Sequence, residues 1–149
     1  MERTTTTGRI LAVEPAQRRT FSLRQANRSL VLVRRIAADI AAEYARLLEH
    51  QEMLELAQRR AAPQELERIQ GVMAGCVARL RGYIDELDAV GARLADVTTG
   101  GVDFPAVVAG RSICFCWQCG EPRVSHWHDR DDESHMRRPI AELILAPTS

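Results

Sequence analysis

The 149-residue chain contains no lysine, so all 20 of its basic residues are arginines. The absence of lysine excludes mechanisms that require one, such as a P-loop of the GxxxxGK type, a Schiff base or the strand lysine of a protein kinase. The arginines balance 20 acidic residues, and a formal net charge of zero gives no overall field that would attract nucleic acid or a membrane surface. Nucleic acid is therefore not an expected partner.

The chain also lacks long apolar runs and the motifs of several enzyme classes. No run approaches the roughly 20 residues that span a bilayer, and the threonine-rich start, Met1–Gly8, lacks the apolar stretch of a signal peptide. We therefore expect a cytoplasmic protein with reduced cysteines and no membrane partner. No GxGxxG, GxSxG or HExxH pattern occurs, so no nucleotide cofactor is expected and neither a serine hydrolase nor a zincin is indicated.

The composition fits one domain with a modest core, because 46% of the residues are hydrophobic and 27% are charged. Apolar residues recur at steps of three and four from residue 26 to 54, and again from residue 66 to Leu94. Two such seams predict two long antiparallel helices that pack like a coiled coil.

The helix boundaries have recognisable signals. Ser22 followed by Gln25 is a capping box, which predicts the start of the first helix, and Pro63 suits the first turn of the second. We expect a polar tail with a short strand over residues 1–20 and the two-helix hairpin over residues 21–98.

Helices of this length must protrude from a compact domain of this size, and an isolated hairpin leaves apolar residues uncovered. Small residues also step by four, three and four along the second helix, at Gly71, Gly75, Ala78 and Gly82. Such a stripe permits a backbone to approach closely, within the chain or between chains, although the glycines could also be merely tolerated. We therefore expect a homodimer that acts as a scaffold or interaction module, with an unknown protein partner as a further expectation.

Residues 99–149 differ in composition from the predicted helices, because they hold four of the seven aromatic residues. Alternating side chains predict strands over residues 112–118 and 123–128, and a third strand over residues 140–145. The expected fold class is therefore α+β, with a long antiparallel helical hairpin and a small antiparallel β subdomain.

The spacing also predicts how the first two of these strands pair. A three-residue loop between them would set Cys114 opposite His128 and Cys116 opposite His126, with all four side chains on one side of the sheet.

Several short motifs identify a relationship. They are Phe21-Ser22-Leu23-Arg24-Gln25-Ala26-Asn27, Gly101-Val102-Asp103-Phe104-Pro105-Ala106, Gly110-Arg111, Cys116-Trp117, Gly120-Glu121, Trp127-His128 and Arg137 before Pro139. At these spacings the chain resembles the bacterial family grouped as domain of unknown function 2203, over most of its length from Phe21. The resemblance implies a cytosolic protein with helices and a small sheet, and the family has no established activity.

The chain departs from the family pattern at two kinds of position. The family's Gly-Phe-x-Gly segment is replaced by Glu133-Ser134-His135-Met136. In addition, Cys114, Cys119, His126 and His135 are not general features of the family.

Three of the four cysteines and three of the four histidines lie within 22 residues of one another. They are Cys114, Cys116, Cys119, His126, His128 and His135. The CxxCG segment has the form of a zinc knuckle, and thiolate and imidazole favour zinc over magnesium or calcium. The preferred ligands are Cys116, Cys119, His126 and His128, with Cys114 or His135 as substitutes. Four protein ligands would form a structural zinc site, whereas three ligands and a water could form a hydrolytic one.

The same residues allow other interpretations, so whether the protein is an enzyme stays open. Reduced cysteines are common in protein cores, and a CxxC pair can also act as a redox centre. Glu121, His128 and Arg137 could bind an anion or perform acid and base steps. Alternatively, they could form a structural network in which Glu121 accepts hydrogen bonds from Arg137.

Overall fold

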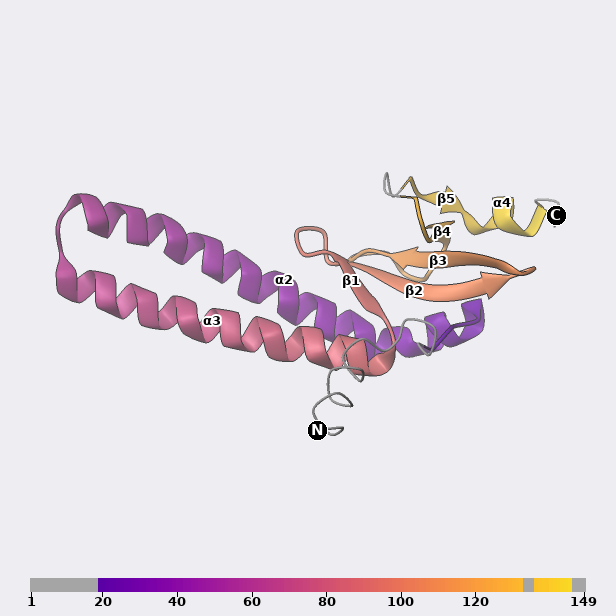
Figure 1. Cartoon of the computed structure of the whole chain (residues 1–149), viewed down its shortest axis with the longest axis horizontal. Helices are drawn as coiled ribbons and strands as arrows, with labels where there is room; N and C mark the ends of the chain where they lie inside the picture. Colours follow the sequence, from indigo (N-terminus) through magenta and orange to yellow (C-terminus); the bar gives the residue numbers. More distant parts are fainter. Residues whose placement is uncertain (1–18, 133–135, 146–149) are drawn as a thin grey trace, which may run out of the picture.

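The computed structural model describes residues 19–132 and 136–145, and it has an α+β fold in which a helical hairpin carries a five-stranded sheet. The elements in chain order are α2 (Leu23–Arg59), α3 (Pro63–Val90), β1 (Arg93–Asp96), β2 (Gly101–Val108), β3 (Arg111–Trp117), β4 (His126–Asp129), β5 (Arg138–Pro139) and α4 (Ile140–Leu145). In Figure 1 the sheet lies along one end of the hairpin, and the turn between the two helices extends away from it. Within the described ranges, no helix is both long and apolar enough to cross a bilayer.

The two helices begin where the sequence predicts. The Ser22 hydroxyl accepts a hydrogen bond from the Gln25 backbone N–H at 3.1 Å, and the Gln25 side chain accepts one from the Ser22 N–H at 2.9 Å. This capping box satisfies two N–H groups that have no partner inside the helix. Pro63 occupies the first turn of α3, as predicted. Helix α2 has 37 residues, so it is about 55 Å long at 1.5 Å per residue.

Helix α3 ends earlier than its apolar spacing predicts. Gly91 adopts a left-handed conformation with a φ of 102°, and its N–H bonds to the Asp88 carbonyl. Glycine takes this conformation at little cost, so the residue ends the helix. Leu94 therefore lies in β1, and its prediction as a helical residue is wrong. The consequence is that the chain turns back into the sheet inside the range predicted as hairpin.

The sheet is antiparallel throughout, with the strands in the order β1-β2-β3-β4-β5. Strand β4 sets His128 opposite Cys114 and His126 opposite Cys116, which is the predicted register. The connection between β3 and β4 covers residues 118–125, however, and is longer than the predicted three-residue loop. Strand β2 was not predicted, and it pairs Asp103 with Cys116 on β3.

Two predicted strands differ from the observed elements. Residues 140–145 form helix α4 rather than a strand, and Ile140 and Leu143 both pack on the core, as residues three apart do on one face of a helix. The strand predicted from residue 123 begins only at His126, because the Val124 N–H bonds at 2.8 Å to the side chain of Asn27 on α2.

A single core joins the hairpin to one face of the sheet. Its members on α2 are Ala26, Leu30, Val33, Ile36, Ala37 and Ile40, and those on the sheet include Phe104, Ala106, Ile113, Phe115, Trp117 and Trp127. Because side chains alternate along a strand, the neighbours Asp103, Cys114, Cys116 and His128 belong to the opposite face. The pattern that builds the core therefore also collects the polar and thiol residues on the other side of the sheet.

The stripe of small residues on α3 does not pack within the described chain. A Cβ added at Gly71 or Gly82 would meet no atom within 4 Å, and one at Gly75 would meet only Arg79 of the same helix. Ala78 is exposed. The sequence allows close packing at this stripe either within the chain or between chains. Packing between chains is the one that remains a prediction.

We expect the substitution Gly100→Ala to lower the free energy of unfolding by about 2 kcal/mol. Gly100 has a φ of 68°, which costs a residue with a Cβ about 1–2 kcal/mol, and the new Cβ would collide with the Cys119 side chain. Urea unfolding of Gly100→Ala, Cys119→Ala and the double variant measures both contributions. Gly100→Ala should destabilise the Cys119→Ala protein less than it destabilises the wild type. An equal loss of stability in both backgrounds would contradict the collision with Cys119.

Candidate metal centre

Three adjacent strands bring a carboxylate, a thiol and an imidazole together. The ligand atoms of Asp103 on β2, Cys114 on β3 and His128 on β4 all lie within 4.8 Å of one another. The register explains the meeting: Asp103 stands opposite Cys116, and His128 stands opposite Cys114. The side chains of Asp103 and His128 must therefore reach toward each other across β3. All three residues are buried, and His128 is only 3% exposed.

Both ring nitrogens of His128 face oxygen atoms that can only accept hydrogen bonds. Its Nδ1 lies 2.7 Å from the Asp129 carbonyl oxygen, and its Nε2 lies 3.2 Å from a carboxylate oxygen of Asp103. Each nitrogen then donates a proton, and His128 is an imidazolium ion. The Asp103 carboxylate and the Cys116 sulfur raise the pKa of His128 to about 11, although burial opposes the shift. His128 and Asp103 therefore form a buried ion pair.

Burial raises the pKa of both thiols of β3, Cys114 and Cys116, and for Cys116 it outweighs the opposite effect of a hydrogen bond with His128. The Cys116 sulfur lies 3.9 Å from the Cys114 carbonyl oxygen. Burial also raises the pKa of Cys119. Neither thiol of the CxxC pair, Cys116 or Cys119, is therefore an activated nucleophile, which weakens the interpretation of this pair as a redox centre.

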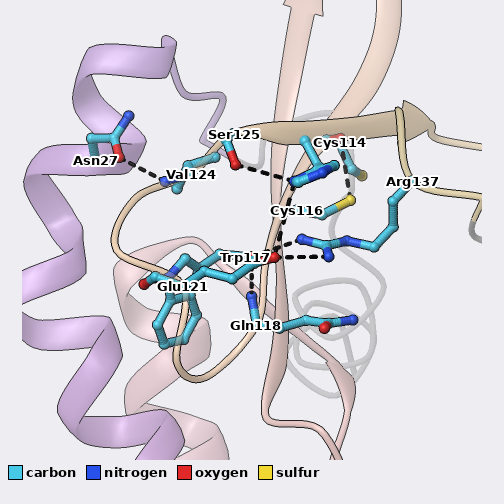
Figure 2. A network of polar contacts seen from close by, with 10 residues as sticks. Asn27, Cys114, Cys116, Trp117, Gln118, Glu121, Val124, Ser125 and Arg137 are labelled. Carbon is cyan, nitrogen blue, oxygen red and sulfur yellow. Dashed lines mark hydrogen bonds and ion pairs between the residues drawn. The ribbon is translucent and has the colours of Figure 1, made fainter. Parts of the chain in front are cut away.

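A second polar pair lies beside the thiols. Arg137 donates two hydrogen bonds to the Glu121 carboxylate, at 2.9 and 2.8 Å, and Figure 2 displays this pair next to Cys116. Glu121 also accepts hydrogen bonds from the Gln118 N–H and, through its backbone carbonyl, from the Trp117 indole, each at 2.9 Å. Glu121 therefore accepts hydrogen bonds from Arg137, as the structural-network interpretation predicts.

A pocket of about 130 Å³ adjoins the cluster. Its polar lining comprises Asp96, Thr99, Asp103, Gln118, His128 and Arg137, together with the thiol of Cys116. This volume is close to the roughly 150 Å³ of a cavity that accommodates benzene. A water molecule or a small ligand can therefore reach the side of the cluster that Asp103 and His128 present to the pocket.

Of the six cysteines and histidines that the sequence singles out, the structure brings Cys114 and His128 into the cluster, with Cys116 beside them. Cys119 is exposed in the connection after β3, and its side chain lies against Gly100. The His126 ring, opposite Cys116 in the sheet, contacts the Ser125 hydroxyl at 3.1 Å and lies 4.0 Å from the Glu121 carboxylate. His135 lies outside the described residues, as does the predicted strand of the N-terminal tail.

Sequence reasoning missed Asp103 as a candidate ligand. It is the single charged residue of the strand GVDFPAVV, whose other members are apolar, glycine or proline. A buried charge in such a strand requires a partner, and that signal was available in the sequence.

We expect Glu121→Gln to lower the free energy of unfolding by about 1–3 kcal/mol at neutral pH, since it leaves a partly buried guanidinium without its counter-charge. Burial raises the pKa of Glu121, but the Arg137 and Gln118 hydrogen bonds outweigh this effect and hold the pKa below its usual value of 4.5. A lowered pKa stabilises the fold above pH 4.5, and this stabilisation is lost as the pH falls through the folded-state pKa. Urea unfolding should therefore show the difference between wild type and variant shrinking below pH 4.5; a constant difference would contradict the assignment.

A family model described as an uncharacterized conserved protein (DUF2203) matches residues 19–140. No curated protein and no solved structure matches the chain.

Proposed function

We propose that this chain, which belongs to the uncharacterised conserved family DUF2203, binds a divalent transition-metal ion, preferably zinc, at Asp103, Cys114 and His128. The observation that carries the proposal is the approach of one oxygen, one sulfur and one nitrogen ligand atom to within 4.8 Å of one another in a buried site. This proposed ligand set differs from the one that the sequence favours: it adds Asp103 and leaves out Cys119 and His126, which do not belong to the group of three ligand atoms.

The chemistry of the three donors favours zinc. A thiolate and an imidazole are poor ligands for magnesium or calcium, whereas zinc accepts sulfur, nitrogen and oxygen ligands. The hydrogen bond from Nδ1 of His128 to the Asp129 carbonyl fixes the ring and leaves Nε2 directed at Asp103. Two ligand atoms about 2.05 Å from a tetrahedral zinc lie about 3.3 Å apart, and the observed separation of Nε2 and the carboxylate oxygen is 3.2 Å.

Charge also supports the proposal. A zinc ion would replace the Nε2 proton of His128 and the thiol proton of Cys114. The two positive charges of zinc would then be balanced by one carboxylate and one thiolate, which a buried site tolerates far better than an unpaired ion. Three protein ligands with an adjoining pocket leave a position for water, which is the arrangement of hydrolytic zinc sites.

The test is the zinc content of the full chain, measured by elemental analysis after purification without chelator. We expect one zinc per chain in the wild type, and loss of zinc in His128→Ala and in Cys114→Ser. His126→Ala and Cys119→Ser are matched controls, because they remove the same side-chain types outside the cluster, and both should retain zinc. A wild type without zinc, or a loss confined to the two control variants, would refute the proposal.

Self-association is a second candidate function. Leu48, Leu56 and Val77 are 41–48% exposed on the hairpin, and the stripe of small residues on α3 is open. Light scattering tests this expectation: a dimer at micromolar concentration would support it, and a monomer would end it.

A further inference from the structure

We infer that Cys116 supplies a fourth protein ligand to the metal, so that the complete ligand set is Asp103, Cys114, Cys116 and His128. The inference rests on the proposed function, and it assigns a role to a thiol beyond the three-residue cluster. It also changes the nature of the site, because four protein ligands close the coordination sphere that three would leave open.

The strand register favours this role. Cys114 and Cys116 are two residues apart on β3, so their side chains share one face of the sheet. Asp103 stands directly opposite Cys116 and His128 directly opposite Cys114, and such cross-strand pairs have Cβ atoms about 5 Å apart. Because Asp103 and His128 meet across β3, their contact lies between the positions of the two cysteines. A metal bound there would have one thiol on each side.

The Cys116 side chain lines the pocket beside the cluster, together with Asp103 and His128. Its sulfur is not one of the three ligand atoms that lie within 4.8 Å of one another. The sulfur contacts the Cys114 carbonyl oxygen only weakly, at 3.9 Å. To bind a metal, the Cys116 side chain would give up this weak contact and turn toward Asp103 and His128.

Arg137 provides an independent observation. Its Nε is buried and has no hydrogen-bond partner among the described residues. The two terminal nitrogens are fixed by Glu121, and Arg137 and Cys116 line the same pocket beside the cluster. Figure 2 shows the two side chains next to each other. A thiol is a weak acceptor, whereas a metal-bound thiolate would accept the Nε–H, and outer-shell donors of this kind accompany most metal ligands.

The ligand set predicts which metals bind. Two thiolates select zinc, cobalt or cadmium over magnesium and manganese. A dication with one carboxylate and two thiolates carries one net negative charge. The guanidinium of Arg137 lies next to Cys116 and would offset this charge.

The test is the absorption spectrum of the full chain titrated with cobalt(II), because the sulfur-to-cobalt charge-transfer intensity rises with the number of bound thiolates. We expect the wild type and Cys119→Ser to have equal intensity, and Cys116→Ser, once saturated with cobalt, to have about half. We also expect Cys116→Ser to weaken zinc binding by more than about 100-fold, the upper range for loss of an outer-shell partner.

The outcomes separate this inference from the proposed function. Cobalt binding with an unchanged spectrum in Cys116→Ser would overturn the inference and leave the three-ligand site standing, whereas no binding to the wild type would refute both. If Cys116→Ser does not fold by circular dichroism, alkylation of the wild type decides the matter. Zinc should then protect two thiols from the reagent, and protection of one would overturn the inference.

Discussion

Replacing Asp103 by alanine is expected to lower the unfolding free energy of the metal-free protein by about 3–5 kcal/mol, the usual cost of removing one partner from a buried ion pair. The substitution leaves the His128 imidazolium, which is 3% exposed, without its carboxylate. In the variant, His128 can avoid an unpaired charge by giving up its proton at high pH. The decrease in unfolding free energy should therefore be greatest at pH 6 and smaller at pH 9. Urea unfolding of the chelator-treated protein at both pH values measures this effect.

Two variants control for other consequences of the change. Asp96→Ala removes an exposed carboxylate from the wall of the same pocket, together with the hydrogen bond that it accepts from the Thr98 N–H, so its loss should cost about 1 kcal/mol. Asp103→Asn combined with His128→Gln substitutes a neutral pair that can still hydrogen-bond, and it should be more stable than Asp103→Ala. Equal stability of Asp103→Ala and Asp96→Ala would contradict the ion pair.

The second large effect is stabilisation by zinc. A ligand that binds only the folded state at 100 times its dissociation constant stabilises that state by about 2.7 kcal/mol. For a chain of about 150 residues this corresponds to a rise in Tm of roughly 5–11 °C. Differential scanning calorimetry with and without zinc should record the rise in the wild type and in His126→Ala.

The same measurement on Cys114→Ser and His128→Ala should show no rise in Tm with zinc. Magnesium at equal concentration is the matched control ion, and it should leave every variant unchanged, because the thiolate and imidazole donors suit it poorly. A rise with zinc that persists in both variants would mean that zinc binds elsewhere on the chain.

The helical part of the fold was predictable because its signals are local. The capping box at Ser22 and the proline at the start of α3 act within one turn of helix, and the apolar seam of α2 repeats over many residues. The end of α3 was missed because the spacing of Val90 and Leu94 continues the pattern, while Gly91 between them ends the helix. A single glycine with a positive φ outweighed the periodicity.

The sheet was predictable only in part, because its strands depend on contacts distant in sequence. Alternation identified β3 and the register of β4, but β2 contains Pro105, which normally argues against a central strand. The structure accommodates this proline because β1 pairs only with Gly101, Val102 and Asp103, and the Pro105 carbonyl accepts the Phe21 N–H at 2.8 Å.

The candidate site was also predictable only in part, because it depends on strand pairing between residues that are distant in sequence. Cys114 and His128 follow from the β3–β4 register, but Asp103 is recognisable as their neighbour only once β2 is known to pair with β3. Cys119 was favoured because it completes a CxxC motif. It lies beyond the end of β3, where the chain has already turned away from the face that holds the cluster.

The central claim is that one metal binds between Asp103, Cys114 and His128. Anomalous diffraction at the zinc edge, from crystals of the zinc-loaded full chain, tests it most directly. We predict a single peak about 2.0–2.3 Å from the Asp103 carboxylate, the Cys114 sulfur and Nε2 of His128. A peak at Cys119 and His126, or no peak in protein that retains zinc in solution, would contradict the account.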